Sequence, residues 1–281
     1  MNTSTAEQLK EIVKEKYGEI AEQSKEQNEL GCCGATCGCS TIDEAIMADD
    51  YSSLKGYVAD ADLGLGCGLP TEFALIKEGD TVVDLGSGAG NDSFIARSIV
   101  GEKGRVIGID MTEKMVEKAK RNAEKMNFKN VTFQLGDIED NPLKENLADV
   151  VVSNCVLNLV PNKQKAFEET FRILKKGGHF SVSDIVLVGQ LPEGLRKSAE
   201  MYAGCVSGAI QKEEYLDVIT KVGFENVKVQ KEKRINIPEE ILKEYLKEDE
   251  VESFTNGQTG IFSITVYAEK PASCCGPECC S

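Results

Sequence analysis

One stretch of the chain, residues 81–100, limits the possible folds more than any other. Three of its first five residues are branched and apolar, as expected for a strand that is covered on both faces. Gly86, Gly88 and Gly90 follow, and residues without a β-carbon allow sharp turns and close approach of a ligand. The segment 91–100 is predicted to be a helix whose free N–H groups face the glycine turn. This order predicts a nucleotide-type site at the carboxyl end of a parallel strand.

Strands and helices are predicted to alternate from this stretch onward. Such alternation produces a parallel sheet with helices on both faces. We therefore expect an α/β protein with a doubly wound, mostly parallel sheet. The predicted strands lie near residues 81–86, 105–110, 131–136, 148–154 and 179–186, and the predicted helices near residues 91–100, 112–127 and 162–175.

The glycine spacing indicates which nucleotide is bound. The dinucleotide fingerprint G-x-G-x-x-G does not fit, because the third glycine comes one position early and Asp84 precedes the turn. The pattern resembles the first motif of the Rossmann-like S-adenosylmethionine (SAM) methyltransferases, and NAD or another nucleotide is the alternative. Asp110 ends the next predicted strand, where an acid can accept hydrogen bonds from both ribose hydroxyls. Gly136-Asp137-Ile138 follows the third strand and resembles the adenine-binding motif of the same family.

Three motifs at three strand ends are more specific than one glycine-rich loop. The resemblance implies a Rossmann-like SAM-dependent methyltransferase fold with SAM as the cofactor. The residues expected to bind it are Asp84, Gly86, Ser87, Gly88, Gly90, Asp110, Met111, Asp137, Ile138 and Asn154.

The parts outside this core are expected to cover it and to bind substrate. Residues 5–28 have the apolar spacing of an amphipathic helix, and a second helix is predicted near residues 41–50. After residue 187, helices are predicted at 192–209, 213–222 and 238–250 and strands at 227–235 and 261–268. The predicted division is an N-terminal helical arm with a Cys-rich loop at 1–60, a SAM-binding core at 61–187, a substrate lobe at 188–270 and a flexible Cys-rich tail at 271–281.

Charge and composition exclude several classes of function. The net charge of −15 argues against a nucleic-acid substrate, because phosphates require a basic surface. No apolar run approaches the length of a membrane span, and the N-terminus lacks the pattern of a secretory signal. We therefore expect a cytoplasmic enzyme with a small substrate.

The chain contains 11 cysteines and one histidine. A histidine-based metal site or a Ser-His-Asp triad is therefore almost excluded, and His179 itself is expected in a surface turn. Four cysteines lie at positions 32–39, four at 274–280, and three stand apart in the chain: Cys67, Cys155 and Cys205. Without a secretory signal these thiols are expected to be reduced rather than to form structural disulfides.

The three separate cysteines indicate the methyl acceptor. Cys67 lies in a loop of glycines that should leave its sulfur accessible, and Cys155 follows the fourth predicted strand, where a doubly wound sheet presents side chains to substrate. No general base is evident near Cys67, Cys155 or Cys205 in the sequence. An acceptor with a lone pair and no proton to lose explains this absence, and trivalent arsenic held by three soft thiolates is such an acceptor.

Four segments, 64–70, 84–90, 153–159 and 202–209, together resemble the arsenite SAM-methyltransferase family. The resemblance covers roughly residues 40–270, and it departs from the family where Leu69, before Pro70, stands in place of an expected asparagine. It implies that Cys67, Cys155 and Cys205 bind arsenic and that Cys33 or Cys32 is a fourth, redox-active thiol. It also implies that thioredoxin or a small thiol reduces the disulfide that forms after methyl transfer. The cysteines of the tail are interpreted as an accessory arsenic site or as a metal-binding tail without catalytic role: Cys274, Cys275, Cys279 and Cys280.

Two other functions remain possible at this stage. The chain can be a SAM methyltransferase for a small organic acceptor, with structural cysteines. It can also be a thiol-rich metalloid-binding or redox protein that retains the fold. Fold alone does not decide among the three.

Overall fold

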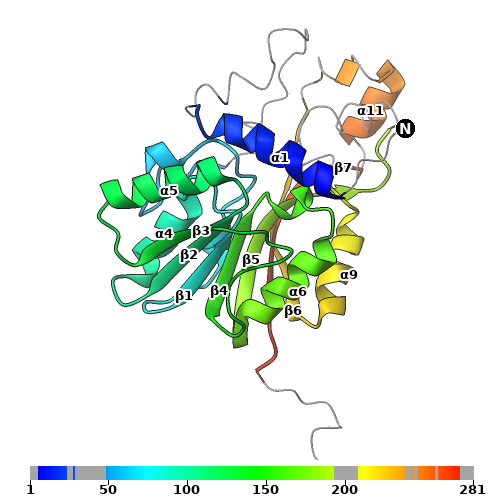
Figure 1. Ribbon diagram of the computed structural model, residues 1–281. Coiled ribbons are helices and arrows are strands. Elements are labelled where there is room, and N and C mark those ends of the chain that lie inside the picture. The colour runs from blue at the N-terminus through cyan, green and yellow to red at the C-terminus, as the bar shows by residue number, and fades with distance from the viewer. Residues whose placement is uncertain are drawn as a thin grey trace, which may run out of the picture.

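Seven strands form one mixed sheet (Figure 1). The computed structural model describes residues 6–23, 28, 49–192, 208–237, 239, 242–243, 246–256 and 259–272. The strands are β1 (Thr81–Leu85), β2 (Arg105–Asp110), β3 (Val131–Leu135), β4 (Ala148–Asn154), β5 (Leu174–Val188), β6 (Glu225–Arg234) and β7 (Gly260–Glu269). Their order is β3-β2-β1-β4-β5-β7-β6. The first five run parallel, and β7 is antiparallel to both β5 and β6, which confirms the expected mostly parallel sheet.

Helices cover both faces of this sheet (Figure 1). One apolar cluster joins the sheet to α4 and α5, and a second joins it to α6 and α9. The neighbours Val82 and Val83 in β1 belong to different clusters, because successive side chains of a strand point to opposite faces. The helices are α1 (Ala6–Ile20), α3 (Pro70–Phe73), α4 (Asn91–Val100), α5 (Glu113–Lys125), α6 (Lys163–Ile173), α9 (Lys212–Val222) and α11 (Glu248–Asn256), with short 3-10 turns η2 (Ala59–Ala61) and η3 (Leu157–Leu159).

Three segments differ from the sequence prediction. The N-terminal helix predicted over 5–28 ends at Ile20, and residues 21–23 are not helical. The fifth strand begins at Leu174 rather than near residue 179, because Leu174 already pairs with Ala148 of β4 where α6 ends. His179 therefore lies in β5 and not in a surface turn, with Nε2 2.6 Å from the carbonyl oxygen of Ala74. The helix predicted over 238–250 is also wrong in its bounds, since Leu246 and Lys247 are not helical and α11 begins at Glu248.

The segment after residue 187 contributes β6 and β7 to the main sheet rather than a separate one. The helices predicted near 41–50 and 192–209 lie almost entirely outside the described residues, as does most of the tail 271–281. Helix α1 lies across the carboxyl-end edge of the sheet (Figure 1), and its side chains Lys10, Val13 and Tyr17 reach the main cavity. None of the described helices is long and apolar enough to cross a membrane.

Candidate active site

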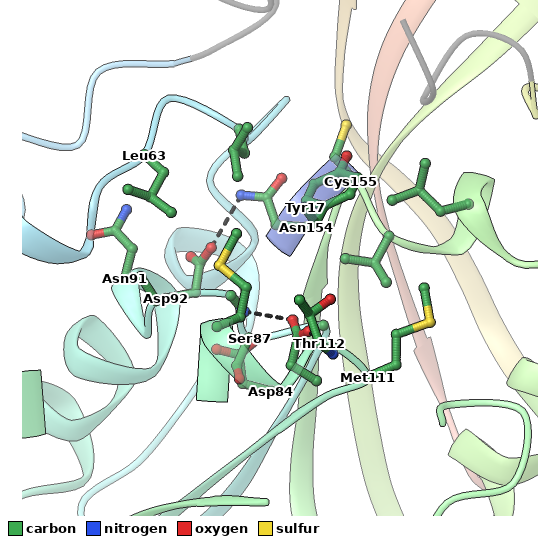
Figure 2. Close-up of a pocket in the computed structure, with 18 of the residues that line it drawn as sticks. Tyr17, Leu63, Asp84, Ser87, Asn91, Asp92, Met111, Thr112, Asn154 and Cys155 are labelled. Atoms are coloured by element: carbon green, nitrogen blue, oxygen red, sulfur yellow. Dashed lines mark hydrogen bonds between the residues drawn. The ribbon is translucent and has the colours of Figure 1, made fainter. Parts of the chain in front are cut away.

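A cavity of about 1030 Å³, counted with its opening to solvent, lies at the carboxyl ends of β1, β2 and β4 (Figure 2). Its charged lining is almost entirely acidic. Lys10 is the one basic side chain among the described residues that line it. The acidic residues of the lining are Asp62, Asp84, Asp92, Asp110 and Asp137. The cavity is therefore suited to a ligand that carries positive charge.

The glycine turn forms one wall of the cavity. The backbone N–H groups of Gly86 and Ser87 both donate to the carbonyl oxygen of Ile109, at 2.7 and 3.0 Å. Gly86 has a φ of +71°, and a β-carbon there would lie 2.3 Å from a methyl group of Val156. Gly88 has a φ of +51° and no heavy atom within 4 Å of a β-carbon position, so its backbone borders open space. Gly86 and Gly88 thus present bare backbone to the cavity. Gly90 is not among the residues that line it, because its backbone packs on the core, where a β-carbon would lie 2.9 Å from the rings of Phe94 and Phe133.

Asp110 lies beside the turn at the end of β2. Its carboxylate accepts hydrogen bonds from Gly88 N at 2.9 Å and from Thr112 N at 2.8 Å. Burial raises the pKa of Asp110, while these two backbone donors act to lower it. Asp137, after β3, is 2.5 Å from the ammonium of Lys10 in α1. Met111 and Ile138 also line the cavity, so all three predicted motifs meet at one site.

Two buried aspartates also line the cavity, Asp84 in β1 and Asp92 in α4. Asp84 accepts a hydrogen bond from Ser93 Oγ at 2.6 Å, and burial raises its pKa to about 8. Asp92 in the first turn of α4 is 7% exposed, and burial raises its pKa to about 6. No lysine or arginine of the described residues forms an ion pair with either aspartate. Asp92 was missed by the sequence analysis, although it follows Gly90 by only two positions.

Asn154, at the end of β4, links Asp92 to the Cys67 loop. Its Nδ2 lies 3.1 Å from Asp92 Oδ2 (dashed in Figure 2), and its Oδ1 accepts from Cys67 N at 3.1 Å. The Tyr51 hydroxyl, which the sequence analysis also missed, bonds to both Asn154 and Asp92. Nothing in the local sequence marks Tyr51, because its partners lie 17 to 103 positions away.

Cys67 and Cys155 form a disulfide bond with a Cα–Cα distance of 5.7 Å. The prediction of reduced thiols with an accessible Cys67 sulfur is therefore wrong for this structure, in which Cys67 is 0% and Cys155 4% exposed. Both residues lie in an apolar cluster with isoleucines of β5 and β7. Cys155 has a φ of +59°, and its N–H donates to the carbonyl oxygen of Ser183 at 2.8 Å. The structure thus brings two of the three predicted arsenic ligands into direct contact, and Cys155 lines the cavity.

The other predicted cysteines lie outside the described residues: Cys32, Cys33, Cys205, Cys274, Cys275, Cys279 and Cys280. Gly208 and Ala209 are the first described residues after Cys205. Gly208 packs so closely on the backbone of Asn158 that a β-carbon would lie 1.8 Å from its carbonyl oxygen. Ala209 packs against the same apolar cluster as Cys67 and Cys155.

Asp184 of β5 corrects the expectation that no acid lies near these cysteines. Its carboxylate and the two sulfurs lie within 4.8 Å of one another, and all three residues are buried. Burial raises the pKa of Asp184 to about 7, and the nearby Lys163 opposes this rise. Asp184 Oδ2 accepts from Tyr215 at 3.2 Å. The sequence did not show this because Asp184 reaches the cysteines from the neighbouring strand.

This geometry agrees with the comparisons to known proteins. A methyltransferase-domain family matches residues 76–223. The arsenite methyltransferase of Halobacterium salinarum is 36% identical over 277 residues, which cover 95% of this chain and 68% of that protein. The chain belongs to the arsenite methyltransferase family. The human member is 35% identical over 227 residues, with 77% of this chain and 58% of that protein covered. An arsenic(III) SAM methyltransferase structure from Chlamydomonas reinhardtii matches with a TM-score of 0.63 and 34% identity, covering 73% of this chain and 68% of that one.

The chain is thus a SAM-dependent methyltransferase with the expected Rossmann-like fold, and it spans 58% to 68% of the length of these relatives. The cavity fits SAM. Among the described residues, the buried Ser87 Oγ and Asn91 Oδ1 have no hydrogen-bond partner although both residues line the cavity. Buried polar atoms normally have a hydrogen-bond partner, and a bound ligand would supply one here. Asp110 and Asp137 also line the cavity, and their carboxylate oxygens are hydrogen-bond acceptors.

Proposed function

We propose that this protein transfers the methyl group of SAM to trivalent arsenic held by the thiolates of Cys67, Cys155 and Cys205. The observation that carries the proposal is the meeting of Cys67 and Cys155 beside the cofactor cavity. Two sulfurs that can form a disulfide can also reach one soft atom between them when they are reduced. The position of Gly208 and Ala209 supports Cys205 as the third ligand.

The protein contributes to the reaction by holding the arsenic acceptor and by excluding water from the site. Three thiolates make trivalent arsenic pyramidal, which leaves its lone pair free to point at the cavity. Bound SAM supplies an activated methyl group on its sulfonium. Methyl transfer forms an arsenic–carbon bond with the arsenic lone pair and breaks the sulfur–carbon bond, so that S-adenosylhomocysteine leaves. The apolar surroundings of Cys67 and Cys155 exclude water from this step.

A reductant is needed because arsenic becomes formally pentavalent. Two cysteine thiolates can return it to the trivalent state by giving up two electrons and forming a disulfide. The Cys67–Cys155 bond corresponds to such an oxidised enzyme. We propose that thioredoxin or a small thiol reduces it by thiol–disulfide exchange, and that Cys33 or Cys32 takes part as a fourth thiol.

The remaining parts of the chain have supporting roles in this proposal. The arm 1–60 covers the SAM-binding core 61–187, in keeping with the position of α1 over the cavity. Residues 188–270 act as the substrate lobe, and Ile235 and Ile261 pack against the cysteine pair. The tail 271–281 collects arsenic through Cys274, Cys275, Cys279 and Cys280 and delivers it. Truncation after Pro271 should slow methylation at low arsenite, and an unchanged rate would remove the delivery role.

The proposal is tested by assaying methylated arsenic after incubation with SAM, arsenite and a thiol. Cys155→Ser and Cys205→Ser should abolish the product while SAM binding, measured by calorimetry, is retained. Cys37→Ser is the matched control, because no role is assigned to that cysteine. Full activity in either Cys155→Ser or Cys205→Ser would reject the assignment.

A methyltransferase for a small organic acceptor is the second candidate, and Asp184 is the observation that favours it. A buried carboxyl with a raised pKa beside the site can act as a general base for an O–H or N–H acceptor. In that case arsenite would not bind to the reduced protein. Binding of arsenite without methyl transfer would instead identify a metalloid-binding protein.

A further inference from the structure

The hydroxyl of Tyr51 and the amide of Asn154 join the cofactor cavity to the Cys67 loop. Tyr51 Oη lies 3.0 Å from Asp92 Oδ2 and 2.8 Å from the carbonyl oxygen of Gly68. Asn154 Nδ2 lies 3.1 Å from the same carboxylate oxygen and 2.9 Å from the same carbonyl oxygen, and it also bonds to Tyr51 Oη. Tyr51 is 4% exposed, and the contacts of its hydroxyl with Gly68 and Asp92 are buried.

These contacts cannot all be hydrogen bonds at the same time. The Tyr51 hydroxyl has one hydrogen, and the Asn154 amide nitrogen has two. These three hydrogens face five contacts: each donor reaches Asp92 Oδ2 and Gly68 O, and Asn154 also reaches Tyr51. Burial raises the pKa of Tyr51 well above its usual range, so its hydroxyl keeps its proton. The hydrogens therefore divide between the carboxylate on the cofactor side and the carbonyl on the cysteine side.

Among the described residues, no lysine or arginine pairs with Asp92 on the cofactor side of this network. Asp92 is buried and lines the cavity. Asp62 adds negative charge that raises the pKa of Asp92, while Lys10, the one basic residue of the described lining, bonds to Asp137. The α-ammonium group on the methionine half of the cofactor is the cation that this end of the cavity would receive. Such a partner would replace the hydrogens that Tyr51 and Asn154 now give to Asp92.

The other side of the network holds Cys67. Its N–H donates to Asn154 Oδ1, and the next residue, Gly68, provides the carbonyl acceptor. Ser263 of β7 donates to the carbonyl oxygen of Cys67. The loop therefore depends on Asn154 and Tyr51 for its position on the cavity side, and a shift of hydrogens toward Gly68 would hold Cys67 more firmly.

We propose that Tyr51 and Asn154 are positioning residues that couple binding of the cofactor's α-ammonium group at Asp92 to the placement of Cys67 for arsenic. The inference rests on the proposed function, because it takes Cys67 as an arsenic ligand. Binding at the two sites is then cooperative, and the coupling is reciprocal.

The test measures arsenite binding to the fully reduced protein by calorimetry, with and without a cofactor analogue. S-adenosylhomocysteine carries the α-ammonium group, and 5′-methylthioadenosine has the same nucleoside without it. We expect S-adenosylhomocysteine to tighten arsenite binding at least about 5-fold, within the usual range of allosteric coupling, and methylthioadenosine to leave it nearly unchanged. Tyr51→Phe removes one of the shared hydrogens and should reduce the coupling to below about 2-fold. Tyr267→Phe is the matched control, because the Tyr267 hydroxyl donates to Glu269 at the end of β7 and takes no part in the network of Tyr51 and Asn154.

The possible results distinguish a failure of the coupling from a failure of the proposed function. Equal tightening by both analogues, no tightening by either, or full coupling in Tyr51→Phe would overturn the coupling even if arsenite is methylated. Failure of the reduced wild-type protein to bind arsenite at all would overturn the proposed function and the inference that rests on it. The comparison of the two analogues uses wild-type protein, so it does not depend on the folding of a variant.

Discussion

Reduction of the Cys67–Cys155 disulfide should lower the free energy of unfolding by several kcal/mol. The two cysteines are 88 positions apart in the sequence. In the chain-entropy treatment, releasing a loop of that length returns about 15 cal/mol/K to the unfolded chain, which is about 4.6 kcal/mol at 25 °C. Both sulfurs are buried in an apolar cluster. We therefore expect most of this change to come from the unfolded state, with a measured loss of about 3 to 5 kcal/mol.

Urea unfolding with and without a phosphine reductant measures this loss. Cys67→Ser is the control, because it cannot form the bond but keeps the other cysteines that a reductant can affect. Its unfolding should respond little to the reductant. Two results would refute the view that the Cys67–Cys155 bond stabilises the folded protein. One is a loss of unfolding free energy below about 1 kcal/mol in the wild type, and the other is an equal loss in Cys67→Ser.

Three further predictions concern the same site. Gly86→Ala should destabilise the protein by more than about 2 kcal/mol in urea unfolding, because its β-carbon would lie 2.3 Å from Val156. Gly88→Ala should cost only about 1 kcal/mol, because no heavy atom lies within 4 Å of its β-carbon position. Equal losses in the two variants would contradict this account of the turn. Asp110→Asn should weaken SAM binding in calorimetry about 10-fold or more, since a charged hydrogen-bond acceptor is lost, and unchanged affinity would exclude a ribose contact. Asp184 has a pKa raised to about 7, so the folded state binds more protons than the unfolded state between about pH 4 and 7 and stability falls as the pH rises through that range. In Asp184→Asn this fall should be smaller, by up to about 4 kcal/mol, and identical pH profiles would disprove the shift.

The sheet and the cofactor wall could be predicted because their signals are local. Each parallel strand is a short apolar run, and each motif residue directly follows its strand, so sequence order alone brings Gly88, Asp110 and Asp137 to one edge. The turn glycines also have positive φ angles that few other residues adopt. These features depend on neighbours in the sequence and not on distant pairing.

The chemistry around the cysteines could not be predicted in the same way. Asp184 reaches Cys155 because β4 and β5 are neighbours and Asn154 pairs with Ser183, a register that the sequence does not reveal. The start of β5 at Leu174 was missed for the same reason, since pairing with β4 extends the strand through residues that resemble a helix end and a turn. Tyr51 is placed by tertiary contacts, namely hydrogen bonds to Gly68 and Asp92 and packing in an apolar cluster with Leu69 and Ile95.

Arsenic K-edge X-ray absorption of the reduced protein with one equivalent of arsenite tests the central claim most directly. We predict three sulfur neighbours around arsenic in the wild type and a loss of one sulfur in each of Cys67→Ser, Cys155→Ser and Cys205→Ser. A coordination sphere of oxygen, or an unchanged sulfur count in these variants, would contradict an arsenic site built from the three thiolates.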